Sequence, residues 1–82
     1  MPRRQFVEIN WDDTTSLASW TTKDALPKVA KATNRGWVIT EDKTCVTLAA
    51  SIIAADTPED EELFGDVTVI PRGCITGRKA LR

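Results

Sequence analysis

The chain has 82 residues, a formal net charge of −1, and 41% hydrophobic and 28% charged residues. This length allows one domain whose core buries about 60–65% of the surface of the unfolded chain. The composition excludes a disordered chain and a membrane-embedded one, and the near-neutral charge argues against a protein that coats a nucleic-acid backbone. From the length we expect a single domain spanning residues 1–82. Because the N-terminus lacks the apolar segment of a signal peptide, we expect this domain to be cytoplasmic.

The side chains present narrow the chemistry that is open to the protein. Histidine is absent, which excludes Ser/His and Cys/His nucleophile pairs and imidazole zinc sites. Cys45 and Cys74 lack Cys-x-x-Cys spacing, so we expect two reduced, partly buried thiols rather than a redox pair. We expect no enzyme activity, no cofactor and no metal site.

Residues Gln5 to Trp11 predict a first strand, because Val7, Ile9 and Trp11 alternate with polar residues. The residues that follow, 12–16, have short oxygen-bearing side chains of the kind that form a turn or cap a helix. We therefore expect one or two helical turns before Pro27, with an inner side formed by Leu17, Ala18, Trp20 and Leu26. Asp12 and Asp13 beside Ser16 also allow a carboxylate pair that activates a hydroxyl or binds a metal, but capping is the closer match.

Two apolar, β-branched runs, residues 29–40 and 44–53, predict a hairpin with a polar turn at residues 41–43. Gly36 indicates either a bend or a place where another backbone comes close. The next segment, residues 54–65, has five carboxylates between Asp56 and Glu62. Their spacing does not match a calcium loop, so we expect a flexible, solvated loop whose charge can steer a basic partner.

The last stretch, residues 65–81, predicts two short strands hinged at one tight step. Val67, Val69 and Ile70 favour a strand, Pro71 removes one ladder donor, and Gly73 permits an unusual backbone conformation. Strands that close in this way are typical of small barrels. The sequence therefore predicts a mainly β fold, a half-open antiparallel barrel of about five strands with a short helical insert after the first strand.

Aromatic and basic residues supply the candidate binding site. The chain has three tryptophans, more than so small a barrel encloses, so we expect at least one to be a stacking platform or a subunit contact. If the C-terminal strand lies beside Arg35, then Arg35, Arg72, Arg78 and Lys79 form one anion-binding edge; the alternative is that these charges are simply solvated.

Part of the chain resembles the Sm-like family. Residues 36–48 look like its strand, acidic turn and strand, and residues 70–75 are similar to its Ile-Arg-Gly-x-x-Ile motif with an inserted proline. The resemblance implies an Sm-like or SH3-like barrel, and RNA contacts from Arg72 and Gly73. The asparagine that holds an RNA base beside the acidic turn in that family is absent, with Val46 or Thr47 near its place.

Nearly the whole chain resembles small, largely uncharacterised proteins encoded by bacteriophages and prophages. The motifs that carry this resemblance are Val-Glu-x-x-Trp-Asp-Asp at residues 7–13, Ser-x-x-x-Trp at 16–20, Gly-Trp-Val-x-x-Glu-Asp at 36–42, Val-x-Leu-Ala-x-Ser at 46–51 and Ile-Pro-x-Gly-Cys-Ile at 70–75. The resemblance implies a viral accessory protein in the cytoplasm of a bacterial host.

These observations lead to one expected function and two alternatives. We expect a non-enzymatic, self-associating binding module for a host protein or a small anionic ligand. The residues expected to bind are Trp20, Arg35, Trp37, Arg72, Gly73 and Arg78. The alternatives are an RNA or single-stranded DNA binding protein, and a structural joining piece of the virion.

Overall fold

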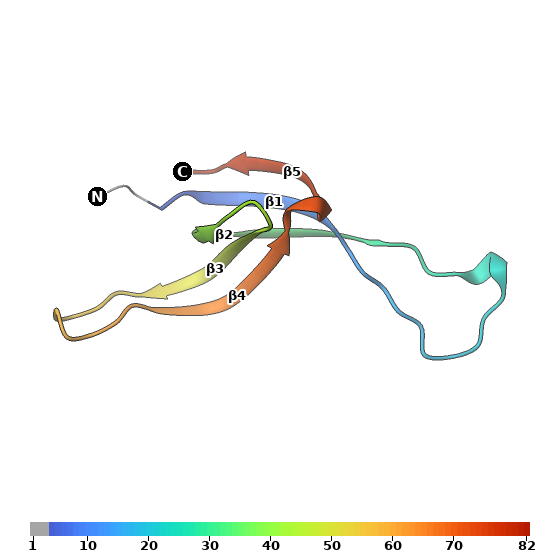
Figure 1. Cartoon of the computed structure of the whole chain (residues 1–82), viewed down its shortest axis with the longest axis horizontal. Coiled ribbons are helices and arrows are strands. Elements are labelled where there is room, and N and C mark those ends of the chain that lie inside the picture. Colours follow the sequence, from blue (N-terminus) through green and yellow to red (C-terminus); the bar gives the residue numbers. More distant parts are fainter. Residues whose placement is uncertain (1–3) are drawn as a thin grey trace.

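The computed structural model describes residues 4–82 of the chain. It contains five strands, β1 (Phe6–Asp13), β2 (Ala30–Glu41), β3 (Cys45–Ile53), β4 (Leu63–Pro71) and β5 (Ile75–Ala80). They form one antiparallel sheet in the order β4-β3-β2-β1-β5, so that the chain returns at its end to place β5 beside β1 (Figure 1). The predicted small, mainly β fold with five antiparallel strands is confirmed. The sheet is nevertheless open, with β4 and β5 as its edges, and it does not close into a barrel.

The core is small and comes from alternating positions of three strands. Its buried hydrophobic side chains are contributed by β1, β3 and β4, namely Val7, Ile9, Val46, Leu48, Ala49 and Ile70, of which all but Ala49 form one cluster. Trp11, Val38 and Ile75 are partly buried against this cluster. The predicted inner face of the first strand is confirmed, because Val7 and Ile9 are fully buried and Trp11 packs at their margin.

β2 approaches β3 closely at Gly36. A Cβ atom built on Gly36 would lie 2.8 Å from the backbone oxygen of Ala49. The expectation that another backbone comes close to Gly36 is confirmed. The pairing of β2 with β3 also shifts register between Val38 and Thr40, and such irregularities increase the local twist of a sheet.

The sheet curls enough for residues on non-adjacent strands to meet. Arg4, just before β1, donates two hydrogen bonds to Glu62, just before β4, at 2.9 and 3.0 Å. Two strands separate β1 from β4 in the sheet order. The Arg4 guanidinium also lies 5.3 Å from the centre of the Phe64 ring, so this contact joins the N-terminal segment to the start of β4.

Asp42 builds the turn between β2 and β3. Its Oδ1 accepts hydrogen bonds from the backbone N–H of Thr44 at 2.7 Å, the Thr44 hydroxyl at 2.7 Å and the Cys45 N–H at 2.9 Å. These bonds, led by those from Thr44, lower the pKa of the Asp42 carboxyl to about 2. A carboxylate that bonds backbone amides of the following residues is a local turn signal, and it allows β2 to extend through Glu41.

The helical insert expected after the first strand is not present. Residues 14–29 contain only a single 3-10 turn, Lys23–Ala25, and Leu17, Trp20 and Leu26 are exposed rather than turned inward. Four threonines and two serines between residues 14 and 22 disfavour a helix, because β-branching and side-chain-to-backbone bonds compete with it. The segment leaves the sheet as a long loop that extends away from it (Figure 1).

The expected helix cap is also wrong. Asp12 and Asp13 belong to β1. Asp12 forms an ion pair with Lys31 at 2.9 Å, and Asp13 accepts a 2.8 Å hydrogen bond from the Thr14 N–H. Within residues 4–82 no group of three or more acidic or cysteine side chains is arranged to hold a metal ion. No helix in the same residues is long and apolar enough to cross a membrane.

The acidic loop is shorter than expected, since β4 begins at Leu63. Leu63 and Phe64 pair with Ile53 and Ile52, so the hairpin ladder takes up the three residues that end the expected loop. The connection between β3 and β4 is therefore residues 54–62. The expected hinge near the C-terminus is present as the 3-10 turn Arg72–Cys74, although Gly73 does not use a positive φ there.

Candidate functional site

Arg72 and Arg78 meet at one carboxylate. Arg72 Nη2 lies 2.7 Å and Arg78 Nη1 2.9 Å from Glu41 Oε2. Arg72 Nε also donates to the backbone oxygen of Asp42, and its backbone N–H donates to the Thr44 oxygen at 2.9 Å. The hydrogen bond from Arg78 is the main cause of a lowered pKa of the Glu41 carboxyl and, reciprocally, of a raised pKa of Arg78. Both arginines thus clamp the β2–β3 turn to the C-terminal part of the chain.

Arg35 belongs to a different ion-pair group. Its Nε donates to Glu8 Oε1 at 2.8 Å, and Lys79 Nζ lies 4.0 Å from Glu8 Oε2. The expected anion-binding edge required β5 to lie beside Arg35, but β1 lies between β2 and β5 and contributes Glu8. The four basic side chains are therefore divided between two carboxylates.

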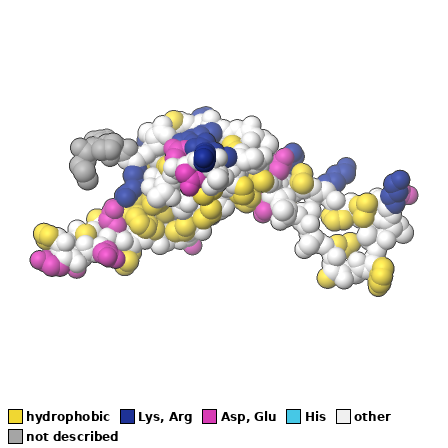
Figure 2. Space-filling view, viewed as in Figure 1, with side chains coloured by type: hydrophobic (Ala, Val, Ile, Leu, Met, Phe, Trp, Pro, Cys, Tyr) yellow, Lys and Arg dark blue, Asp and Glu magenta, His cyan; other side chains and the backbone are white. Residues whose placement is uncertain are grey.

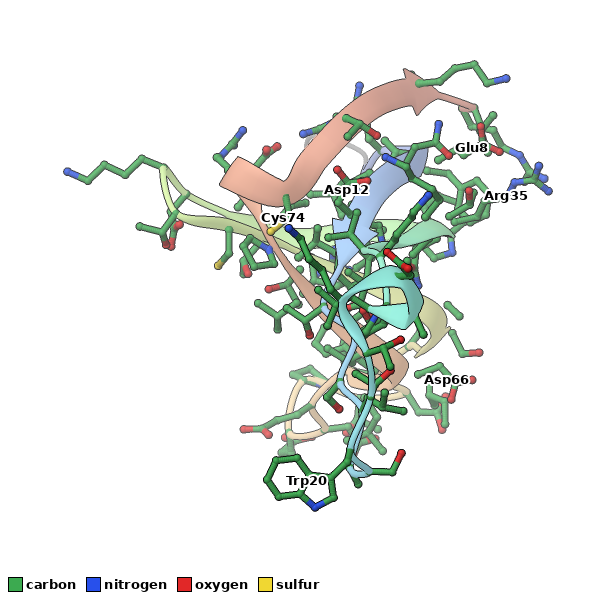
Figure 3. The ribbon with its side chains drawn as sticks, turned by 90° about the vertical axis from the view of Figure 1, so that its right-hand side faces the viewer. Glu8, Asp12, Trp20, Arg35, Asp66 and Cys74 are labelled. Atoms are coloured by element: carbon green, nitrogen blue, oxygen red, sulfur yellow. The ribbon has the colours of Figure 1, made fainter. Side chains whose placement is uncertain are left out.

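The two tryptophans expected to bind have opposite surroundings. Trp37 is half-buried and packs edge-on against Phe6, with ring centres 4.8 Å apart. Trp20 is fully exposed, and Figure 3 shows it pointing into solvent from the loop between β1 and β2, far from Glu8 and Arg35. Gly73 lies in the 3-10 turn, where no heavy atom would be within 4 Å of an added Cβ.

The protein instead presents two arms at opposite ends of its long axis (Figure 1). We define the basic arm as residues 14–29, between β1 and β2, and the acidic arm as residues 53–64, where β3 turns into β4. The principal extents of the chain are 58 × 25 × 21 Å. The arms account for its length, since the five-stranded sheet occupies the middle.

Apolar side chains are exposed along both arms. The basic arm exposes Leu17, Trp20, Leu26 and Val29, each at half or more of its surface. The acidic arm exposes Ile53 and Leu63, and Phe64 to a lesser degree. Figure 2 shows hydrophobic side chains at both ends of the molecule, with acidic groups gathered at one tip and basic groups beside an acidic group toward the other.

The acidic arm carries an open hollow of about 440 Å³. Its apolar lining is Ile53, Ala54 and Leu63, and its acidic lining is Asp56, Glu59, Asp60 and Glu61. An apolar floor with a carboxylate rim suits a group that has both an apolar body and a hydrogen-bond donor or a positive charge.

The surface is large for a chain of this mass. The accessible area is 6591 Å², whereas compact monomers of 9.1 kDa expose about 4,900 Å². The radius of gyration is 16.7 Å, against about 12 Å for a compact domain of this length. The excess of about 1,700 Å² is comparable to the surface that a stable protein–protein interface removes from water, about 1,600 Å² in total.

No family model, curated protein or solved structure matches the chain. The two arms were not predicted from the sequence. Trp20 was expected to be a contact residue, but it was also assigned, with Leu17 and Leu26, to the inner side of a helix. One feature of the sequence could have indicated the arm: residues 14–29 contain no strand-like run against which these side chains could pack.

Proposed function

We propose that this chain is a non-enzymatic assembly module, a joining piece that associates with further copies of itself as part of a larger structure. The observation that carries the proposal is the pair of exposed apolar arms at opposite ends of a sheet with a small core. Monomeric proteins rarely expose large apolar patches without a partner. The resemblance to phage-encoded proteins makes the virion the natural setting for such a piece.

In this proposal the curled sheet is a half-open barrel of the SH3-like kind that holds the arms apart. Binding of a host protein or a small anion at the basic residues has less support, because Arg35, Arg72 and Arg78 already pair with carboxylates. The same pairing weakens the case for RNA or single-stranded DNA, which depends on cations available to phosphates.

The test is the molar mass of the purified chain, measured by light scattering after size exclusion over a range of concentrations. We expect a mass above that of one chain that rises with concentration to a plateau or continues to grow. Trp20→Ala should weaken this association by at least about tenfold, because buried tryptophans dominate contact energies. Lys79→Ala, on β5 and away from both arms, is the control and should leave it unchanged.

A monomer at every concentration would overturn the proposal. The absorbance ratio of the same peak reports nucleic acid. Nucleic acid that copurifies and leaves the protein monomeric once removed would favour the nucleic-acid binding alternative instead.

A further inference from the structure

We infer that copies of this chain join head to tail, with the basic arm of one copy seated on the acidic arm of the next and Trp20 in the hollow between Ile53 and Leu63. The inference rests on the proposed self-association and names the surfaces that carry it. A second copy is the occupant that the charges, the apolar groups and the exposed area of the two arms support.

The charges of the two arms are complementary. The acidic arm has five carboxylates between Asp56 and Glu62 and no basic residue. Arg4 pairs with Glu62, while the other four make no ion pair within residues 4–82. Crowded like charges repel one another, so an approaching cation lowers the energy of this arm.

The basic arm supplies those cations. Lys23 and Lys28 also make no ion pair in the described part of the chain, and Asp24 is the only acidic residue of the arm. Lys23 lies in the 3-10 turn close after Trp20, so an arriving tryptophan brings an ammonium group with it. Charge complementarity of this kind guides encounter and fixes the register of a contact.

Trp20 fits the hollow chemically. Its indole is 103% exposed in the single chain, which leaves a large apolar ring without any packing partner. The apolar groups of Ile53 and Leu63 would face the ring, and the carboxylates at the rim would accept a hydrogen bond from its N–H. The hollow is open rather than enclosed, so it would cover one face of the indole and leave the other face for contacts from the arm that carries it.

The positions of the arms set the kind of assembly. Because they lie at opposite ends of one elongated chain, an arm of one copy meets the other arm of a different copy (Figure 1). Contacts between two different surfaces generate rings when the rotation closes and filaments when it does not. Each copy takes part in two such contacts at about 800 Å² each, which matches the excess area of the single chain.

A charge exchange between the arms tests the inference. The first variant carries Lys23→Glu and Lys28→Glu, so both of its arms are acidic; the second carries Glu59→Lys, Asp60→Lys and Glu61→Lys, so both are basic. Each alone should associate at least about tenfold more weakly than the unaltered chain, because like charges meet across the contact. An equimolar mixture should regain the mass of the original assembly, since every contact then joins an acidic arm to a basic one.

The control carries Lys43→Glu and Lys79→Glu, which change the net charge as in the first variant but lie outside both arms. It should associate as the unaltered chain does. Variants that each assemble normally, or a mixture that stays monomeric while the unaltered chain assembles, would overturn the arm-to-arm contact and leave the proposed function standing. A monomeric unaltered chain would overturn the proposed function itself.

Discussion

Replacing Ile9 by alanine should cost about 3–4 kcal/mol in the free energy of unfolding, among the largest losses that a single truncation of the sheet can cause. Ile9 is fully buried and is, with Leu48 and Ile70, one of the three largest of only six buried hydrophobic side chains in residues 4–82. Few neighbours can move to fill the cavity. Since about 1 kcal/mol shifts the midpoint of a domain of this size by roughly 4–8 °C, the melting temperature should fall by more than 10 °C.

The matched control is Ile53→Ala, which removes the same atoms from a side chain that is 64% exposed on the acidic arm. At dilutions where the chain is monomeric it should change the unfolding free energy by less than about 0.5 kcal/mol. Urea denaturation followed by tryptophan fluorescence measures both variants. Equal losses at the two positions would show that the core is not where the structure places it.

Gly36→Ala should destabilise the sheet by about 2–3 kcal/mol, although it adds a single methyl group. The new Cβ would lie 2.8 Å from the Ala49 oxygen and 3.2 Å from the Ala49 carbonyl carbon and Leu48 Cβ. Two of these are backbone atoms of the neighbouring strand, which cannot turn aside as a flexible side chain does. Relief of the clash requires β2 to move away from β3 close to the register shift between Val38 and Thr40.

Gly73→Ala is the control for this substitution. No heavy atom lies within 4 Å of its added Cβ, and no glycine in the described chain has a positive φ. It should be neutral or stabilise by about 0.4–1 kcal/mol, because alanine restricts the unfolded chain. Thermal denaturation of both variants settles the comparison, and a tolerated Gly36→Ala would contradict the close packing of β2 on β3.

The strands and much of the core were predictable because burial leaves a period-2 pattern in the sequence. Val7 and Ile9 follow that pattern in the first strand, and Val46 and Leu48 follow it after the hairpin turn. Gly36 was predictable for a related reason, since a glycine inside a β-branched run has few uses other than close approach. The strands, the core positions and the role of Gly36 follow from residues close together in the chain, and such local patterns can be recognised in the sequence.

The ion pairs depend on the order of the strands, which the sequence does not display. Arg72 and Arg78 reach Glu41 across 31 and 37 residues of chain. The anion-binding edge was conditional on the C-terminal strand lying beside Arg35, but β1 lies between them and gives Arg35 the partner Glu8 instead. The sequence alone does not distinguish a basic residue that pairs with a carboxylate of its own chain from one that binds an anion.

The arms were not predicted, because a loop that binds a partner and a helix that packs on the core of its own chain can have the same composition. Leu17, Trp20 and Leu26 satisfy either interpretation. The backbone conformation of Asp66 was not predicted either. Asp66 lies inside β4 with a φ of 52°, a conformation that most side chains avoid at a cost of about 1–2 kcal/mol. Nothing in the neighbouring sequence distinguishes this position from a loop residue.

Amide hydrogen exchange at low and high protein concentration tests most directly whether the arms join the copies. At high concentration, exchange should slow in residues 17–28 and 54–62, while the buried part of β1 around Ile9 keeps the rate it has in the single chain. An assembly that forms while both arms exchange as fast as in the dilute protein, with new protection confined to the β4 and β5 edges, would contradict the account.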